Sequence, residues 1–134
     1  MRTLRTFALV VGGMFVLVNP VPAHHEWPVD QTRQITITGT VTAVRWGNPH
    51  VMIYLDVEAN GMIEKWTVGG SSPQSMTTCG WSKKTLQPGD VVTVIGNRFK
   101  DGSNAARMRT AVMPNGKEMS YGAPPLHEAE CGHH

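Results

Sequence analysis

The sequence predicts a mainly β domain, a small five-stranded OB-like β-barrel with one short helix between its third and fourth strands. Short segments rich in β-branched residues alternate polar and apolar side chains along most of the chain, and Asn-Gly and Pro-Gly-Asp turns separate them. One helix signal interrupts the series after the third segment. Three strands, a helix and two strands is the order of an OB fold. An eight-stranded barrel would need a longer chain, and an immunoglobulin-like sandwich would not account for the helix.

The expected strands follow from the period of two. The first runs over 35–46, after a polar lead-in at 28–34, and Gly39 in its middle indicates a bend or bulge. The second covers 50–58 and follows the turn Gly47-Asn48-Pro49. The other expected elements are strands at 62–68, 91–96 and 105–113, a final hairpin strand at 117–121, and a short helix within 74–86, interrupted near Gly80, after the cap Ser71-Ser72-Pro73.

The first 23 residues have the pattern of a signal peptide. Arg2 and Arg5 precede an apolar run over 7–18, and Val21-Pro22-Ala23 supplies small residues at a cleavage site. The apolar run is shorter than the roughly 20 residues that cross a bilayer. We therefore expect export to the periplasm, cleavage after Ala23, an OB-like domain over 24–121 and an irregular tail over 122–134.

Charge argues against two classes of partner. Two of the 12 Lys and Arg residues leave with the signal peptide, so 12 − 2 = 10 basic side chains face 10 acidic ones in a mature chain of 134 − 23 = 111 residues. A neutral chain without a basic run predicts no nucleic-acid partner and no membrane partner after signal cleavage. The expected partners are a metal ion or a periplasmic protein.

The two cysteines and the tail allow two interpretations. Export and an even count predict a disulfide between Cys79 and Cys131. Alternatively, Cys131 stays a thiol and binds metal with the neighbouring histidines. The histidines of this secondary metal candidate are His127, His133 and His134, and an inert tail is the competing interpretation.

Several motifs resemble one group of small exported bacterial proteins that are known only as a domain of unknown function. The matching motifs are the His-His-x-Trp start of the mature chain, the Trp46-x-Asn48-Pro49-His50 element, Gly80-Trp81-x-Lys83, and the segments over 39–42 and 86–94. The resemblance spans about 24–119. It implies a periplasmic location and an OB-like barrel, and it implies no activity. Cys79 and the tail histidines lie outside its pattern.

The mature amino terminus is the main candidate for a metal site. The free amine and imidazole of His24 form a chelate, and His25 adds a second imidazole. His50 is expected at the start of the second strand, next to the loop between the first two strands where OB folds take ligands, and Met52 shares its strand face. Nitrogen donors of this kind favour Cu(II) over Zn(II), so copper is the expected metal and zinc the weaker choice. Alternatively, His50 only hydrogen-bonds backbone to fix a turn.

Two further functions stay open at this point. A metal-free OB-like adaptor would bind a protein, peptide or small ligand through a surface of Trp27, Trp46, Asn48 and Tyr54. A copper oxidase built on an amino-terminal histidine brace would need an open metal position. The chain has no nucleophile elbow, phosphate-binding glycine loop or His-Glu-x-x-His motif, so no catalytic residue is predicted and the chain is not expected to be an enzyme.

Overall fold

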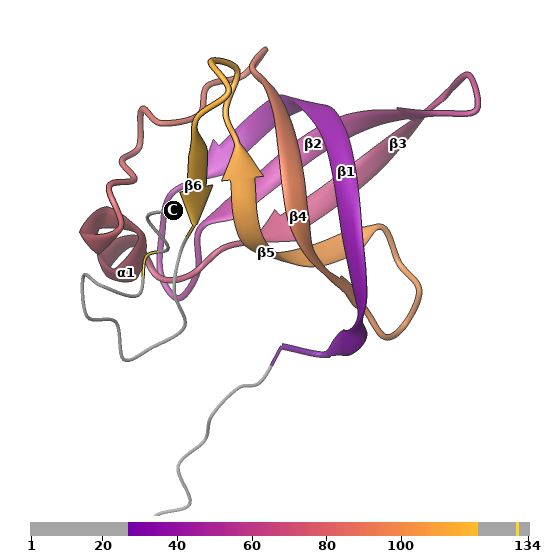
Figure 1. Ribbon diagram of the computed structural model, residues 1–134, viewed down its shortest axis with the longest axis horizontal. Helices are drawn as coiled ribbons and strands as arrows, with labels where there is room; N and C mark the ends of the chain where they lie inside the picture. The colour runs from indigo at the N-terminus through magenta and orange to yellow at the C-terminus, as the bar shows by residue number, and fades with distance from the viewer. Residues whose placement is uncertain (1–26, 121–130, 132–134) are drawn as a thin grey trace, which may run out of the picture.

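The computed structural model describes residues 27–120 and residue 131, which form six strands and one short helix (Figure 1). The predicted signal peptide, His24, His25 and the tail histidines lie outside the described residues. The predicted mainly β fold, with its helix between the third and fourth strands, is confirmed. No helix in the described part of the chain is long and apolar enough to cross a membrane. The elements are β1 (Val29–Arg45), β2 (Met52–Ala59), β3 (Met62–Gly69), α1 (Pro73–Thr78), β4 (Val91–Phe99), β5 (Ala105–Val112) and β6 (Glu118–Ser120).

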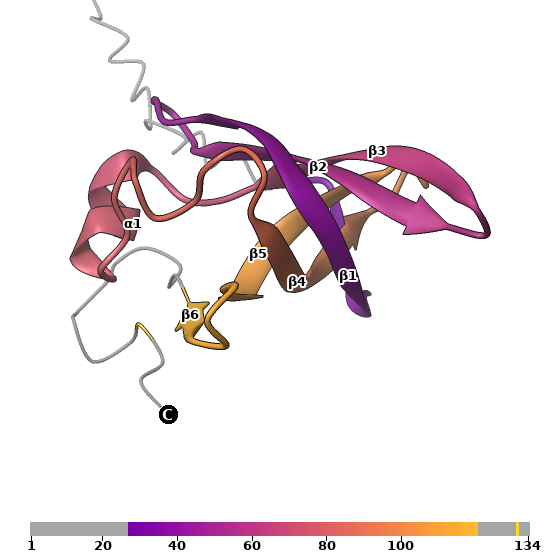
Figure 2. The same cartoon turned by 90° about the horizontal axis from the view of Figure 1, so that it is seen from above.

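Five of the strands close a ring of strand pairing. The order in the sheet is β3-β2-β1-β4-β5-β6, and neighbours in this order are antiparallel. A short parallel pairing between β3 and β5 closes the ring and leaves β6 outside it, on β5. The ring surrounds the core, and α1 lies at one end of it (Figures 1 and 2).

The long strand β1 has two different partners along its length. Its residues from Gln34 to Thr40 pair with β4, whereas its residues from Thr40 onward pair with β2. Gly39 lies just before this change. A Cβ atom at Gly39 would lie 2.7 Å from the carbonyl oxygen of Asp56, so only glycine lets β1 approach β2 this closely. A bulge follows between Val41 and Ala43, close to the bend that the sequence predicted.

The core consists of alternate residues of the ring strands and a plug from the α1 segment. Met76 of α1 and Trp81 after it are buried against the ring. Ser72 caps α1, because its hydroxyl accepts a hydrogen bond from the Ser75 amide. The most deeply buried large side chains are Val41, Val51, Ile53, Leu55, Val68, Met76, Val92, Val94 and Met108.

Several element boundaries differ from the predicted ones. β1 begins at Val29 inside the expected lead-in, because Val29 pairs with Phe99 across an irregular stretch of β1. The helix occupies Pro73–Thr78 and ends just before Gly80, where an interruption was expected and where the φ angle of 85° turns the chain. β2 begins at Met52, so His50 belongs to the loop and not to the strand.

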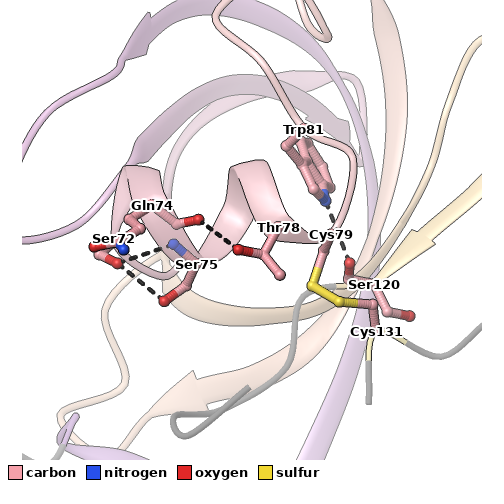
Figure 3. Close-up of a disulfide and its surroundings, with 8 residues drawn as sticks. All are labelled: Ser72, Gln74, Ser75, Thr78, Cys79, Trp81, Ser120 and Cys131. Atoms are coloured by element: carbon pink, nitrogen blue, oxygen red, sulfur yellow. Dashed lines mark hydrogen bonds between the residues drawn. A yellow bond between two sulfur atoms is a disulfide. The ribbon is translucent and has the colours of Figure 1, made fainter. Parts of the chain in front are cut away.

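A disulfide joins Cys79, at the end of α1, to Cys131 (Figure 3). Both residues are buried, and their Cα atoms are 5.3 Å apart. Beside it, the indole Nε1 of Trp81 donates a 3.3 Å hydrogen bond to the carbonyl oxygen of Ser120. The end of β6, the segment after α1 and Cys131 therefore form one connected region. Cys131 is consequently not available as a thiolate ligand.

We expect loss of the disulfide to lower the free energy of unfolding by about 4 kcal/mol, because the bridge closes a loop with a sequence separation of 52. Urea unfolding of a Cys79→Ala, Cys131→Ala double variant measures this loss. Chemically reduced wild type is the control, since it keeps both side chains. An unchanged urea midpoint in a sample with two free thiols would contradict the expectation.

Candidate functional site

Backbone contacts fix the start of the described chain against the end of β4. The Pro28 carbonyl accepts a 2.9 Å hydrogen bond from the Lys100 amide, and Val29 pairs with Phe99. The side-chain amide of Asn97, a buried residue, donates a 3.0 Å hydrogen bond to the carbonyl of Asp30. These bonds hold the backbone on either side of Val29 and so determine where Trp27 lies.

The ring of Trp27 packs on four residues from different elements. Its centroid lies 4.6 Å from that of His50, 5.8 Å from that of Phe99 and 5.4 Å from the guanidinium carbon of Arg107. The fourth contact is Gly69, where a Cβ atom would overlap the Trp27 ring. Because Gly69 has no side chain, the indole of Trp27 can lie directly against the end of β3.

Main-chain hydrogen bonds of the next residue hold His50 in position. The Val51 amide donates a 2.9 Å hydrogen bond to the Ser71 carbonyl, and the Gly70 amide donates a 2.8 Å bond to the Val51 carbonyl. Val51 itself is almost fully buried. The loop between β1 and β2 is therefore joined to the loop after β3 directly beside His50, and the Asn48–Pro49 peptide bond in the same loop is cis.

Two buried nitrogen atoms of this cluster have no hydrogen-bond partner among residues 27–120 and 131. They are Nδ1 of His50 and Nε1 of Trp27. Nδ1 of His50 therefore makes no hydrogen bond to the backbone of the described residues. A buried polar group without a partner costs about 1–3 kcal/mol, so such a pair in one aromatic cluster needs a reason.

Burial lowers the pKa of His50 below its ordinary value of 6.5, and the positive charge of Arg107 lowers this pKa further. The imidazole is consequently neutral at neutral pH, with a lone pair on one ring nitrogen. Only a neutral imidazole binds a metal ion, so the site favours the ligating form of His50.

The other predicted surface residues differ in how exposed they are. Met52 pairs with Gly69 in the strand register, so its half-buried side chain shares the sheet face that Trp27 covers. Tyr54 follows on the same face and is also half-buried. Trp46 is half-buried and packs against the core, whereas Asn48 is exposed.

Sequence reasoning missed Gly69, Phe99 and Arg107. Nothing in their local pattern distinguishes them from ordinary strand residues, and only the pairing of β3 with β5 and of β1 with β4 places them around Trp27. Within residues 27–120 and 131, no group of three or more His, Cys, Asp or Glu side chains could hold a metal ion.

Comparison with known proteins gives a family and no activity. The family model described as "Family of unknown function (DUF6152)" matches residues 14–109. No curated protein sequence matches. Among solved structures, a complex of TiaS with tRNA and ATP aligns with a TM-score of 0.46 and 17% identity over 68% of this chain and 20% of that one. A ZRD-deleted TiaS mutant with agmatine aligns with a TM-score of 0.43 and 18% identity over 63% and 22%. The chain thus spans about a fifth of the length of these proteins.

We expect the His50 imidazole to titrate below pH 6.5, because burial and Arg107 both disfavour its charged form. NMR titration of the ring protons measures the midpoint. In Arg107→Gln the midpoint should rise and still stay below 6.5, since burial is the larger cause. His50 has a higher pKa in the unfolded chain than in the folded one, so the unfolded chain takes up this proton first as the pH falls. His50 should therefore lower the free energy of unfolding as the pH falls through 6.5. A midpoint at or above 6.5 in the wild type would contradict this account.

Proposed function

The chain belongs to the DUF6152 family, whose function is unknown, and we propose from its own residues that it is a periplasmic copper-binding module. The ligands of the proposed site are the processed amino terminus at His24, the imidazoles of His25 and His50, and Met52 as a soft neighbour. The observation that carries the proposal is the buried, unpartnered Nδ1 of His50 against the ring of Trp27. A metal ion bound there would give this nitrogen its missing partner.

Covalent reach supports a shared site. His25 precedes Trp27 by two residues and His24 precedes it by three. An extended chain spans at most about 3.6 Å per residue, so the Cα atoms of these histidines lie within about 7 and 11 Å of the Trp27 Cα. Since the Trp27 ring contacts His50, both amino-terminal imidazoles are within reach of the same metal ion.

The donor chemistry favours copper. A terminal amine with a pKa near 8 and neutral imidazoles release their protons readily to a borderline metal, and nitrogen ligands bind Cu(II) more tightly than Zn(II). Met52 would add a thioether that suits Cu(I). The charge of Arg107 opposes a metal cation as it opposes a proton, so the affinity must come from the ligand bonds.

The compartment is consistent with this chemistry. Removal of the predicted signal peptide would leave His24 as the new amino terminus, and the Cys79–Cys131 disulfide suits an oxidising compartment. The metal-free adaptor is the alternative, in which the Trp27 surface binds a protein, peptide or small ligand. The structure supports the adaptor less than the copper site, because the Trp27 ring already packs on Gly69, His50 and Phe99.

We expect exported protein to begin at His24 by intact mass and to bind one equivalent of Cu(II) with higher affinity than Zn(II). The His50→Ala variant should bind Cu(II) about tenfold more weakly or worse, since it loses one imidazole ligand. Calorimetric titration measures both. The tail must be retained, because truncation at Gly122 would remove Cys131; its histidines are instead silenced by His127→Ala, His133→Ala and His134→Ala.

A glycine pair supplies the matched control for geometry. Gly69→Ala removes no ligand but displaces Trp27, so it should weaken Cu(II) binding, whereas Gly47→Ala has open space around its Cβ and should not. Equal affinities of wild type and His50→Ala would mean that the terminus alone holds the metal. The adaptor would then be the better account.

A further inference from the structure

We propose that a groove at the opposite end of β2 binds an extended polypeptide segment with alternating basic and apolar side chains, added as a strand beside β1. This surface is separate from the proposed copper site. Its lining residues are Thr38, Gly39, Thr40, Asp56, Glu58, Ile63 and Val91.

The groove exists because β1 and β2 separate. Their pairing ends at Thr40 and Asp56. Before Thr40, β1 pairs only with β4. After Asp56, β2 pairs only with β3, from Val57 to Ala59. In Figures 1 and 2 the β2–β3 hairpin accordingly projects beyond β1. One edge of β1 and one edge of β2 therefore border the groove without a strand partner.

The backbone of β1 offers hydrogen bonds to this opening. The Val41 amide donates to the Asp90 carbonyl, and its own carbonyl accepts from the Gly89 amide, so Val41 faces the β4 side. Backbone groups of alternate residues point to opposite edges of a strand. Because the register with β4 is regular from Gln34 to Thr40, the amides and carbonyls of Thr36 and Thr38 face the opening.

The outer face of the opening carries negative charge and exposed apolar area. Asp56 and Glu58 lie on this face, and Asp56 pairs with Lys65, which is itself mostly exposed. Ile63 is 59% exposed and Val91 53% exposed, and they are two of the three exposed large apolar residues among those described. Basic side chains of an added strand would meet the carboxylates, with their stems on Ile63 and Val91.

The inner face of the same opening is apolar. Ile35 and Ile37 point inward, since they alternate with Thr36 and Thr38, and both pack partly buried against the core. Val57 lies across from them on β2 and is buried. Alternate side chains of an added strand would meet this face, so its sequence should alternate basic and apolar residues.

Charge selects this occupant over a second copy of the chain. A symmetric dimer through the groove would gather the acidic side chains of both copies, Asp56 and Glu58, at one interface. Like charges brought close together disfavour such a dimer, whereas a basic segment is attracted. The described part of β1 that borders the opening also lacks proline and lysine, the residues that commonly protect a strand edge.

The test is fluorescence anisotropy with a labelled, blocked octapeptide of alternating valine and lysine, titrated with the metal-free mature protein. We expect saturable binding that weakens with salt, and no binding of the valine–glutamate octapeptide. Glu58→Lys and Ile63→Ser should each weaken binding by about fivefold or more. The matched controls are Glu118→Lys on β6 and Met62→Ser, an exposed apolar residue outside the groove, and both should bind as wild type does.

Three results would overturn the proposal. They are the absence of saturable binding up to about 1 mM protein, binding that Glu58→Lys and Ile63→Ser leave unchanged, and sedimentation of the protein alone as a dimer that Ile63→Ser dissociates. The last result would assign the groove to a second copy. None of them bears on Cu(II) binding, because the groove variants leave His50 and the amino terminus intact.

Discussion

The exchange of partners along β1 is the constraint on which the rest of the structure depends. β1 pairs with β4 up to Thr40 and with β2 from there on, and Gly39 permits the close crossing because a Cβ there would collide with the backbone of β2. The crossing lets five strands close into a ring around one core. It also brings the start of β1 to the end of β4, and it leaves β1 before Thr40 unpaired with β2 after Asp56.

Those two consequences create two surfaces of different chemistry. Where the chain enters β1, Trp27 lies on Gly69 beside His50, and burial makes that imidazole neutral. Where β1 and β2 separate, unpaired strand edges border a groove with carboxylates on one face and apolar residues on the other. The surfaces lie toward opposite ends of β2, where Met52 and Glu58 are about 20 Å apart at the rise of a strand.

The arrangement around His50 depends on packing more than on polar contacts. Two nitrogen atoms are buried without partners there, a cost that the surrounding apolar contacts and backbone hydrogen bonds must offset. A neutral imidazole kept in place in this way is ready to bind a metal ion, because neither deprotonation nor loss of a hydrogen bond at Nδ1 opposes the new bond. The copper proposal rests on this readiness together with the short covalent distance to His24 and His25.

The sequence by itself determined the fold class, the order of elements and the candidate loop. Alternation of β-branched residues, Asn60-Gly61 and the Ser72 cap are local signals, and local backbone preferences are enough to read them. Trp27 and His50 were identified because their residue types carry chemistry. Only the tertiary structure decided that they touch, that Gly69, Phe99 and Arg107 surround them, and that a groove opens beside Thr38. Each of these facts depends on pairing between strands distant in sequence, and local patterns in a single chain do not show which distant strands pair or in what register.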